Sequence, residues 1–169
     1  ANDYAGEVTI EFDASLSGQT ITLDSGEGAL VLANSMTIDG DTGSDGDQDI
    51  TISGDDSVRV FEVDDGDSAT ASDIALEGLI ITGGYAGSAG GGIDAADGDN
   101  VSLNNVTVTE NYACCVGGGV LVDGGTLTIT DSTISDNETG GSGAGVFGYD
   151  ATVVITNSTL STNVAGQDG

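Results

Sequence analysis

The C-terminal half of the chain repeats with a period of about 26 residues, and such a period restricts the fold more than any other sequence feature. The segment GGGVLVDGGTLTITDSTISDNETGGS begins at Gly117, and the similar segment GAGVFGYDATVVITNSTLSTNVAGQD follows it directly, from Gly143. Gly169 stands one more period along the chain, in phase to open another unit. Toward the N-terminus the period becomes one residue longer, since Tyr85 is the counterpart of Tyr112 in the preceding unit. The chain is therefore expected to be a stack of similar units.

Each unit contains three short runs in which apolar and polar residues alternate, such as GVLV, TLTIT and STIS. Alternation of this kind is typical of half-buried strands. A propeller blade needs four strands and about 40 residues, which is too long for this period. Three strands in about 26 residues instead fit one coil of a right-handed parallel β-helix, an all-β solenoid. Each strand then pairs with its counterpart in the coils above and below, about 4.8 Å away.

Equivalent positions in successive units form columns of similar side chains. The apolar columns are predicted to point inward and to form the core: Val108, Ile134 and Leu160, and also Leu103, Ile129 and Ile155. The column of Thr107, Thr133 and Thr159 is predicted to point outward, where β-branched residues suit a pleated surface. The chain is 37% hydrophobic but only 4% aromatic, so we expect a narrow aliphatic interior.

The whole chain, residues 1–169, is predicted to be one β-helix domain. Residues 84–169 contain the regular units, each of about 26 or 27 residues. Residues 1–83 also contain strand-like runs, among them VTIEF, TITL, DITISG and VRVFEV, but at uneven spacing. We interpret this first half as earlier coils with longer loops.

Asparagine occupies one corner in three successive units, at Asn111, Asn137 and Asn163. Stacked parallel strands allow such side chains to form an amide ladder, each bonded to the next. Alternatively, asparagine stands there because it tolerates the left-handed backbone of a tight corner. Both explanations fit the sequence. The Gly-Gly-Gly and Gly-Ala-Gly runs predict another corner, where a Cβ atom has no room.

The charge balance is very uneven, with one Lys or Arg, 29 Asp or Glu and a formal net charge of -28. Such a surface repels nucleic acids and anionic membranes. No run is long and apolar enough to insert into a bilayer. Cations are the expected partners, above all Ca²⁺, which prefers carboxylate oxygens. A highly solvated surface, adapted to high salt, explains the same composition.

The densest acidic segment, DGDTGSDGDQD, is the candidate calcium loop. Its ligands are predicted to be Asp39, Asp41, Asp45, Asp47 and Asp49. The segment departs from the EF-hand pattern because Ile50 stands where the sharp-turn glycine belongs. A calcium loop of another type, or a solvated acidic turn, fits these residues. A smaller acidic cluster contains Asp64, Asp65 and Asp67.

The two cysteines, Cys114 and Cys115, are adjacent and fall at a predicted corner. Three states fit this position: a bond between the two, a bond between neighbouring molecules, or free thiols. A C-x-x-C metal or redox motif is absent. Four N-x-S/T sequences provide candidate glycosylation sites, although chance matches are common in a chain so rich in Asn and Thr. They are at Asn100, Asn105, Asn137 and Asn157.

The order of these motifs resembles a known group of surface proteins. FDASLSGQTITLDSGEGALVLANSMTIDG, DITISGDDSVRVFEV and LEGLIITGGYAGSAGGGI are similar to the N-terminal region of bacterial surface proteins with CSLREA-type domains. The later GGGV and SDN elements resemble the repeats of polymorphic outer-membrane proteins. The CSLREA box is missing here, and Val108, Ile134 and Leu160 replace the Phe of the FxxN repeat. The resemblance implies a secreted or displayed β-helix with an adhesive, envelope or matrix role.

A structural function is expected rather than an enzymatic one. Lyases of this fold need a cationic group, and the chain has no His, no Lys and only Arg59. Glycoside hydrolases need paired carboxylates, but here the Asp residues lie mostly in turns. We expect an extracellular subunit that binds itself end to end in a filament or matrix fibre, because no capping segment is evident. The alternatives are a module of a larger adhesin, bound to neighbouring repeats, and a β-helix that binds or degrades polysaccharides.

The chain begins at Ala1 rather than Met, which fits an exported protein whose signal peptide was cut after a small residue, although a chain trimmed for another reason would begin in the same way. A secreted or cell-surface location is therefore expected.

Overall fold

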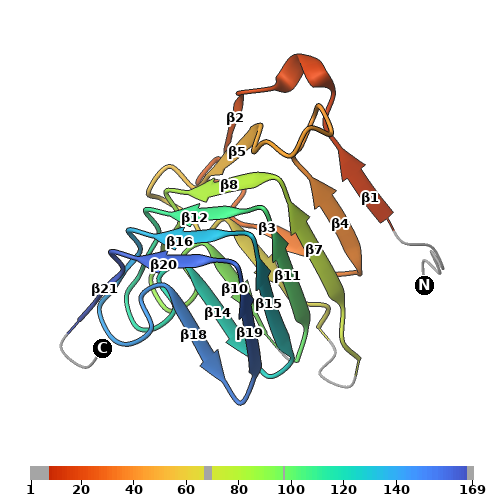
Figure 1. The fold of residues 1–169 in the computed structure, drawn as a ribbon. Helices are drawn as coiled ribbons and strands as arrows, with labels where there is room; N and C mark the ends of the chain where they lie inside the picture. Colours follow the sequence, from red (N-terminus) through yellow and green to blue (C-terminus); the bar gives the residue numbers. More distant parts are fainter. Residues whose placement is uncertain (1–7, 67–69, 97, 167–169) are drawn as a thin grey trace.

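The fold is a parallel β-solenoid, as the sequence repeat predicts (Figure 1). The computed structural model describes residues 8–66, 70–96 and 98–166. The chain winds through about six coils, and every strand pairs in parallel with the strand one coil before or after it. Within the described residues, the only helical element is one 3-10 turn, η1 (Ala14–Leu16), and no helix is long and apolar enough to cross a membrane.

Three sheets correspond to the three predicted strands of each coil. Sheet A contains β1 (Val8–Glu11), β4 (Met36–Asp39), β7 (Asp73–Glu77), β11 (Asn100–Asn104), β15 (Thr126–Thr130) and β19 (Thr152–Thr156). Sheet B contains β2 (Thr20–Thr22), β5 (Ile50–Ser53), β8 (Leu79–Thr82), β12 (Thr107–Thr109), β16 (Thr133–Ser135) and β20 (Thr159–Ser161). Sheet C contains β3 (Leu30–Leu32), β6 (Phe61–Val63), β10 (Ile93–Ala95), β14 (Val120–Asp123) and β18 (Val146–Tyr149).

A fourth and shorter sheet follows sheet B in the regular coils. Sheet D contains the two-residue strands β9 (Tyr85–Ala86), β13 (Tyr112–Ala113), β17 (Glu138–Thr139) and β21 (Val164–Ala165). Such short strands cannot show alternation, so the sequence predicted three strands where the regular coils have four. Tyr85 and Tyr112 stack in this sheet with ring centroids 5.4 Å apart.

The register agrees with the columns read from the sequence. Val108 pairs with Ile134, which pairs with Leu160. Leu103, Ile129 and Ile155 form the corresponding column in sheet A. The first half is less regular, because the step from Met36 to its partner Ile74 is longer than the step from Leu127 to Val153. The extra residues form loops at the corners.

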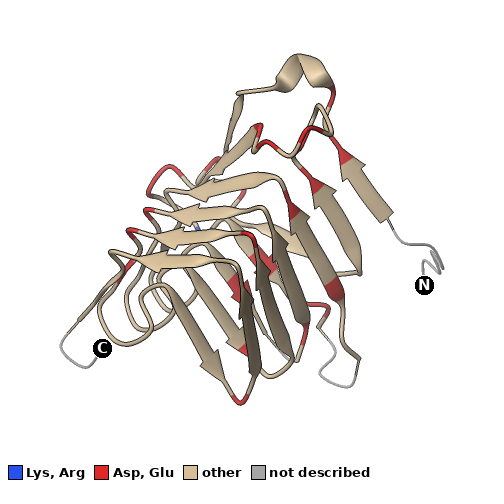
Figure 2. Cartoon of the chain, viewed as in Figure 1, with Lys and Arg blue, Asp and Glu red and all other residues tan. Residues whose placement is uncertain are grey.

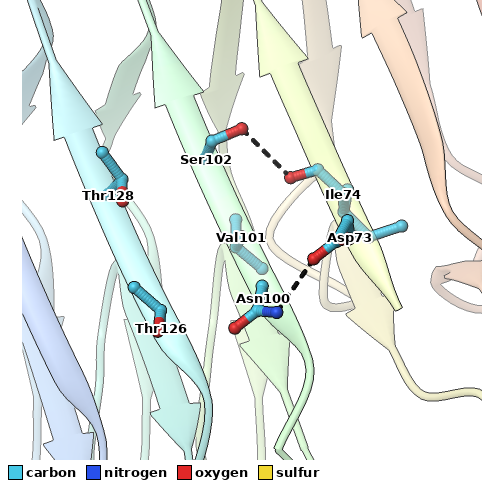
Figure 3. A pocket seen from close by; sticks show the side chains of 7 residues that line it. All are labelled: Asp73, Ile74, Asn100, Val101, Ser102, Thr126 and Thr128. Atoms are coloured by element: carbon cyan, nitrogen blue, oxygen red, sulfur yellow. Dashed lines mark hydrogen bonds between the residues drawn. The ribbon is translucent and has the colours of Figure 1, made fainter. Parts of the chain in front are cut away.

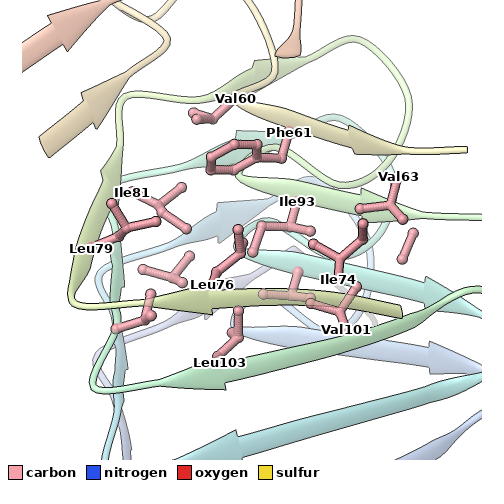
Figure 4. Close-up of a cluster of buried hydrophobic side chains, with 14 of the residues drawn as sticks. Val60, Phe61, Val63, Ile74, Leu76, Leu79, Ile81, Ile93, Val101 and Leu103 are labelled. Carbon is pink, nitrogen blue, oxygen red and sulfur yellow. The ribbon is translucent and has the colours of Figure 1, made fainter. Parts of the chain in front are cut away.

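The core is a continuous aliphatic column along the solenoid axis (Figure 4). Ile74, Leu76, Leu79 and Ile81 are fully or almost fully buried, and side chains of the following coils stack on them. Phe61 is the one aromatic residue in the buried cluster of the described chain. A narrow interior leaves little space for rings, which explains the low aromatic content.

Two corners explain many of the glycines and of the residues with positive φ. The corner between sheets A and B has a left-handed residue in successive coils: Gly78, Asn105, Asp131 and Asn157. At the predicted glycine corner, Gly117 has φ +64°, and a Cβ on Gly118 would collide with the carbonyl oxygens of Glu138 and Ala144. The Gly-rich run is therefore required for adjacent coils to approach each other.

Candidate functional site

The acidic segment forms a loop between β4 and β5, at the corner between sheets A and B. Later coils cross this corner in one or two residues, so the loop is an insertion. It lies against the fourth coil, because the Thr107 hydroxyl donates to Gln48 Oε1 at 2.7 Å and Asn105 Nδ2 donates to the Gly46 carbonyl at 2.9 Å. These contacts fix the loop on the outside of the solenoid.

Three of the five predicted calcium ligands converge. Asp41, Asp45 and Asp49 each place a carboxylate oxygen within 4.8 Å of the other two. Asp41 accepts hydrogen bonds from the backbone N–H groups of Asp45 and Gly46, at 3.1 and 2.8 Å. These bonds curl the loop around the Asp41 carboxylate. The curl brings the carboxylates of Asp45 and Asp49 close to that of Asp41. The group offers hard oxygen ligands of the kind that Ca²⁺ prefers.

Two hydroxyl groups hold the Asp49 carboxylate in place. Its Oδ2 accepts from the Thr42 hydroxyl at 2.6 Å, and its Oδ1 accepts from the Ser17 hydroxyl at 2.7 Å. Both bonds lower the pKa of Asp49, and the bond from Thr42 has the larger effect. The carboxylate therefore keeps its charge to a lower pH than an Asp without these bonds, which suits a metal ligand.

Asp39 and Asp47, the other two predicted ligands, are not part of the triad. Asp39 accepts a hydrogen bond from the Asp41 N–H and lies in sheet A. Its register neighbours are Glu11 and Glu77, so three carboxylates occupy adjacent rungs of one column. Figure 2 shows these acidic strand ends beside the loop. Like charges on adjacent rungs repel, and a cation nearby reduces that repulsion.

The second acidic cluster lies beside a buried carboxylate, Asp99, that the sequence did not indicate. Asp65 accepts from the Thr70 hydroxyl at 3.1 Å, while Asp67 lies outside the described residues. Asp99 is fully buried and accepts from the Ser72 N–H at 2.6 Å. Burial raises the pKa of Asp99, and the negative charge of Asp65 adds to the effect. The sequence shows only an Asp before a strand, with no signal of its burial.

The three corner asparagines form an amide ladder. Asn111 Nδ2 donates to Asn137 Oδ1 at 2.9 Å, and Asn137 Nδ2 donates to Asn163 Oδ1 at 3.0 Å. The left-handed residue at this corner is the preceding one in each coil, namely Glu110, Asp136 and Thr162. Hydrogen bonding, rather than tolerance of positive φ, therefore explains the asparagine at this position.

The candidate glycosylation sites differ in exposure. Asn137 is fully buried in the ladder, so the folded chain offers no space for a glycan there, and that prediction is wrong. Asn100 and Asn105 are half-buried, and their side-chain amides donate to Asp73 and to the Gly46 carbonyl. Asn157 is exposed at the left-handed corner between β19 and β20.

Cys114 and Cys115 follow β13 on the exposed surface of the fourth coil, as free thiols whose Sγ atoms lie 2.7 Å apart.

The sole cationic side chain, Arg59, lies at another corner, where it contacts Asp94 at 2.6 Å and donates to the Gly90 carbonyl at 2.9 Å. Its position indicates a structural role between coils.

A shallow hollow of about 250 Å³ lies on the outer face of sheet A (Figure 3). Asp73, Asn100, Ser102, Thr126 and Thr128 are among its lining residues. Asn100 Nδ2 donates to Asp73 Oδ1 at 2.8 Å, and Asp73 is the one carboxylate among the lining residues that the structure describes. Glycoside hydrolysis normally requires a pair of carboxylates, and the described lining of this hollow supplies one.

The fold defines the chain as a parallel β-solenoid repeat protein. Comparisons with protein-family models, with curated proteins and with solved structures found no significant match. The resemblance to CSLREA-domain proteins and polymorphic outer-membrane proteins thus rests on sequence motifs alone.

Proposed function

We infer that the chain is an extracellular structural protein whose copies stack end to end into a filament. The observation that carries this proposal is the exposed apolar interior at both ends of the described solenoid. Ile155 and Leu160 are each 44% exposed in the last coil, whereas Ile129 and Ile134, one coil earlier, are 0% exposed. Val8, Ile10 and Ile21 are similarly exposed in the first coil.

The unpaired edges of the end strands support the same proposal. β1 and β2 lack a strand partner on one side, and β19 and β20 lack one on the other, among the described residues. Such rows of free N–H and C=O groups are templates for pairing with another chain. The strands at both ends run in the same direction as the rest, so a translated copy continues the parallel pairing.

When the strand register within one copy is extended across the junction to the next copy, apolar residues pair with apolar residues. In sheet A, Val8 and Ile10 of one copy meet Val153 and Ile155 of another, because these residues share columns. In sheet B, Ile21 meets Leu160. No charge enters the core at these positions, so the contact avoids the cost of an unpaired buried charge. Sheet C has one strand fewer in the described residues, and the proposal therefore rests on sheets A and B.

A contact between two different ends of the same molecule does not close, so it produces a filament. The net charge of -28 opposes this assembly, because every copy repels the next. Salt or divalent cations screen the repulsion. We place Ca²⁺ at Asp41, Asp45 and Asp49, where it would reduce the charge and hold the loop.

The alternative is a module of a larger adhesin, in which neighbouring coils of the same chain cover both ends. The motif resemblance favours this alternative, and it also supports the extracellular location in either case. Catalysis is not part of the proposal, because the described residues that line the hollow on sheet A include a single carboxylate. A reducing-sugar assay on acidic and neutral polysaccharides is expected to show no release of product.

Sedimentation velocity tests the assembly step. The sedimentation coefficient is expected to rise with protein concentration, and more steeply in high salt or with Ca²⁺ than in dilute buffer with a chelator. A coefficient that stays at the monomer value under all these conditions would reject stacking and favour the adhesin module.

A further inference from the structure

Cys114 and Cys115 have a geometry that favours a reaction with each other. Both side chains are exposed, and their Sγ atoms lie 2.7 Å apart, within direct contact of each other. They are the only cysteines in the sequence. A reaction between them therefore consumes every thiol in the chain.

The backbone at this corner is fixed on both sides. The Cys114 N–H donates to the Ala86 carbonyl at 3.0 Å, and the Cys115 N–H donates to the Ser88 carbonyl at 2.9 Å. On the other side, the Ser142 N–H donates to the Cys115 carbonyl at 3.2 Å. Gly140 and Gly141 of the next coil have no Cβ, which leaves room for the Cys114 and Cys115 carbonyls. The peptide groups are held in the ladders while both side chains remain free to react.

The position of the pair in the solenoid argues against a bond between stacked copies. β13, which precedes the cysteines, has β9 on one side and β17 and β21 on the other. End-to-end contact therefore leaves Cys114 and Cys115 away from the junction. A bond between molecules would require a lateral contact that brings two such corners together.

We propose that Cys114 and Cys115 form a redox-active pair that a small-molecule disulfide oxidises to an eight-membered ring within one chain. One thiolate attacks a sulfur of the oxidant RSSR, forming a mixed disulfide and releasing RS⁻. The second thiolate attacks the protein sulfur of that mixed disulfide, closing the Sγ–Sγ bond and releasing the second RS⁻. The two thiols lose two electrons and two protons, and the oxidant leaves as two RSH. This inference is independent of the filament proposal.

The chemistry predicts when the ring opens and closes. Adjacent Cα atoms are about 3.8 Å apart, whereas disulfides usually join Cα atoms about 4.4–6.8 Å apart. The ring is therefore expected to be reduced more readily than an ordinary disulfide. The hydrogen bond with Cys115 raises the pKa of the Cys114 thiol, so closure is expected to be faster at alkaline pH.

Incubation of the reduced full chain with glutathione disulfide, followed by intact-mass measurement and a thiol count, tests the proposal. The wild type is expected to lose both thiols, to weigh two hydrogens less, and to run as a monomer on non-reducing gels. The C114S and C115S variants each keep one thiol, and are expected to retain bound glutathione or to form linked dimers. Wild-type dimers, two bound glutathiones per chain, or two thiols that stay free would each overturn the proposal.

Discussion

The side-chain amide of Asn111 donates a hydrogen bond to the side-chain oxygen of Asn137, one coil further along, over 2.9 Å. Asn137 Oδ1 also accepts from the Asn111 N–H at 3.1 Å, and Asn137 Nδ2 donates to the Val108 carbonyl at 3.0 Å. One fully buried side chain thus satisfies backbone groups of the coil before it and continues to Asn163.

Replacing the middle of this ladder is expected to be costly. Asn137→Ala leaves the Asn111 N–H and the Val108 carbonyl buried without these partners, and each such group costs about 1–3 kcal/mol. We expect a loss of about 3–5 kcal/mol in the free energy of unfolding, measured by denaturant titration. Asn163→Ala is the matched control, because Asn163 is only half-buried in the last coil, and its loss should be about 1 kcal/mol. Equal losses in both variants would show that the ladder does not stabilise the stack through its buried centre.

The glycine corner offers a test of how closely the coils approach. Gly118→Ala places a methyl group against two backbone carbonyls that cannot move separately from their coils, and we expect a loss of about 2–3 kcal/mol. Gly87→Ala is the control, because a Cβ at that position meets no atom within 4 Å. Thermal melting followed by circular dichroism measures both. If the two variants melt together, the close approach at Gly118 is not a constraint on the fold.

The sequence alone predicted the solenoid and the register of its regular coils, because inward and outward columns recur at a fixed offset. It did not predict sheet D, since pairs such as Tyr112–Ala113 are too short to show a period. It identified the acidic loop and all three converging aspartates, but it did not separate them from Asp39 and Asp47. Asp41, Asp45 and Asp49 meet because the loop curls around Asp41, whereas a reading of alternate aspartates assumes an extended chain. The burial of Asp99 depends on the neighbouring coil and left no signal in the sequence.

Calcium is expected to stabilise the chain through the aspartate triad. An ion that binds only the folded form adds about 2.7 kcal/mol to the free energy of unfolding when its free concentration is about 100 times its dissociation constant. Asp45→Asn is expected to remove most of the calcium-dependent rise in Tm. Asp47→Asn removes the same charge from the same loop but outside the triad, and should retain the rise. Chelator-treated wild type that shows no shift on adding calcium would contradict the proposed site.

Asp94 is expected to make the stability of the folded chain depend on pH in the acidic range. Burial raises its pKa from 3.8 to about 6, outweighing the attraction of Arg59, while Glu62, Asp123 and Asp64 raise it further. The folded chain therefore binds this proton more tightly than the unfolded chain, so the contribution of Asp94 to stability falls as pH rises from about 4 to about 6. Asp94→Asn removes the titration, and the Tm of this variant relative to wild type is expected to increase across that range. A relative Tm that decreases would mean that the ion pair with Arg59 dominates instead.

Negative-stain electron microscopy of wild type and two end variants, in high salt with calcium, tests the stacking proposal most directly. Ile155→Asp puts a charge into the exposed end of the core, while Val154→Asp puts the same charge on the outer face of the same strand. Wild type and Val154→Asp are expected to form filaments with a subunit repeat of roughly 29 Å, six rungs at about 4.8 Å each. Ile155→Asp, shown to be folded by circular dichroism, should remain as single particles. Dispersed wild-type particles, or filaments of Ile155→Asp indistinguishable from wild type, would contradict end-to-end assembly.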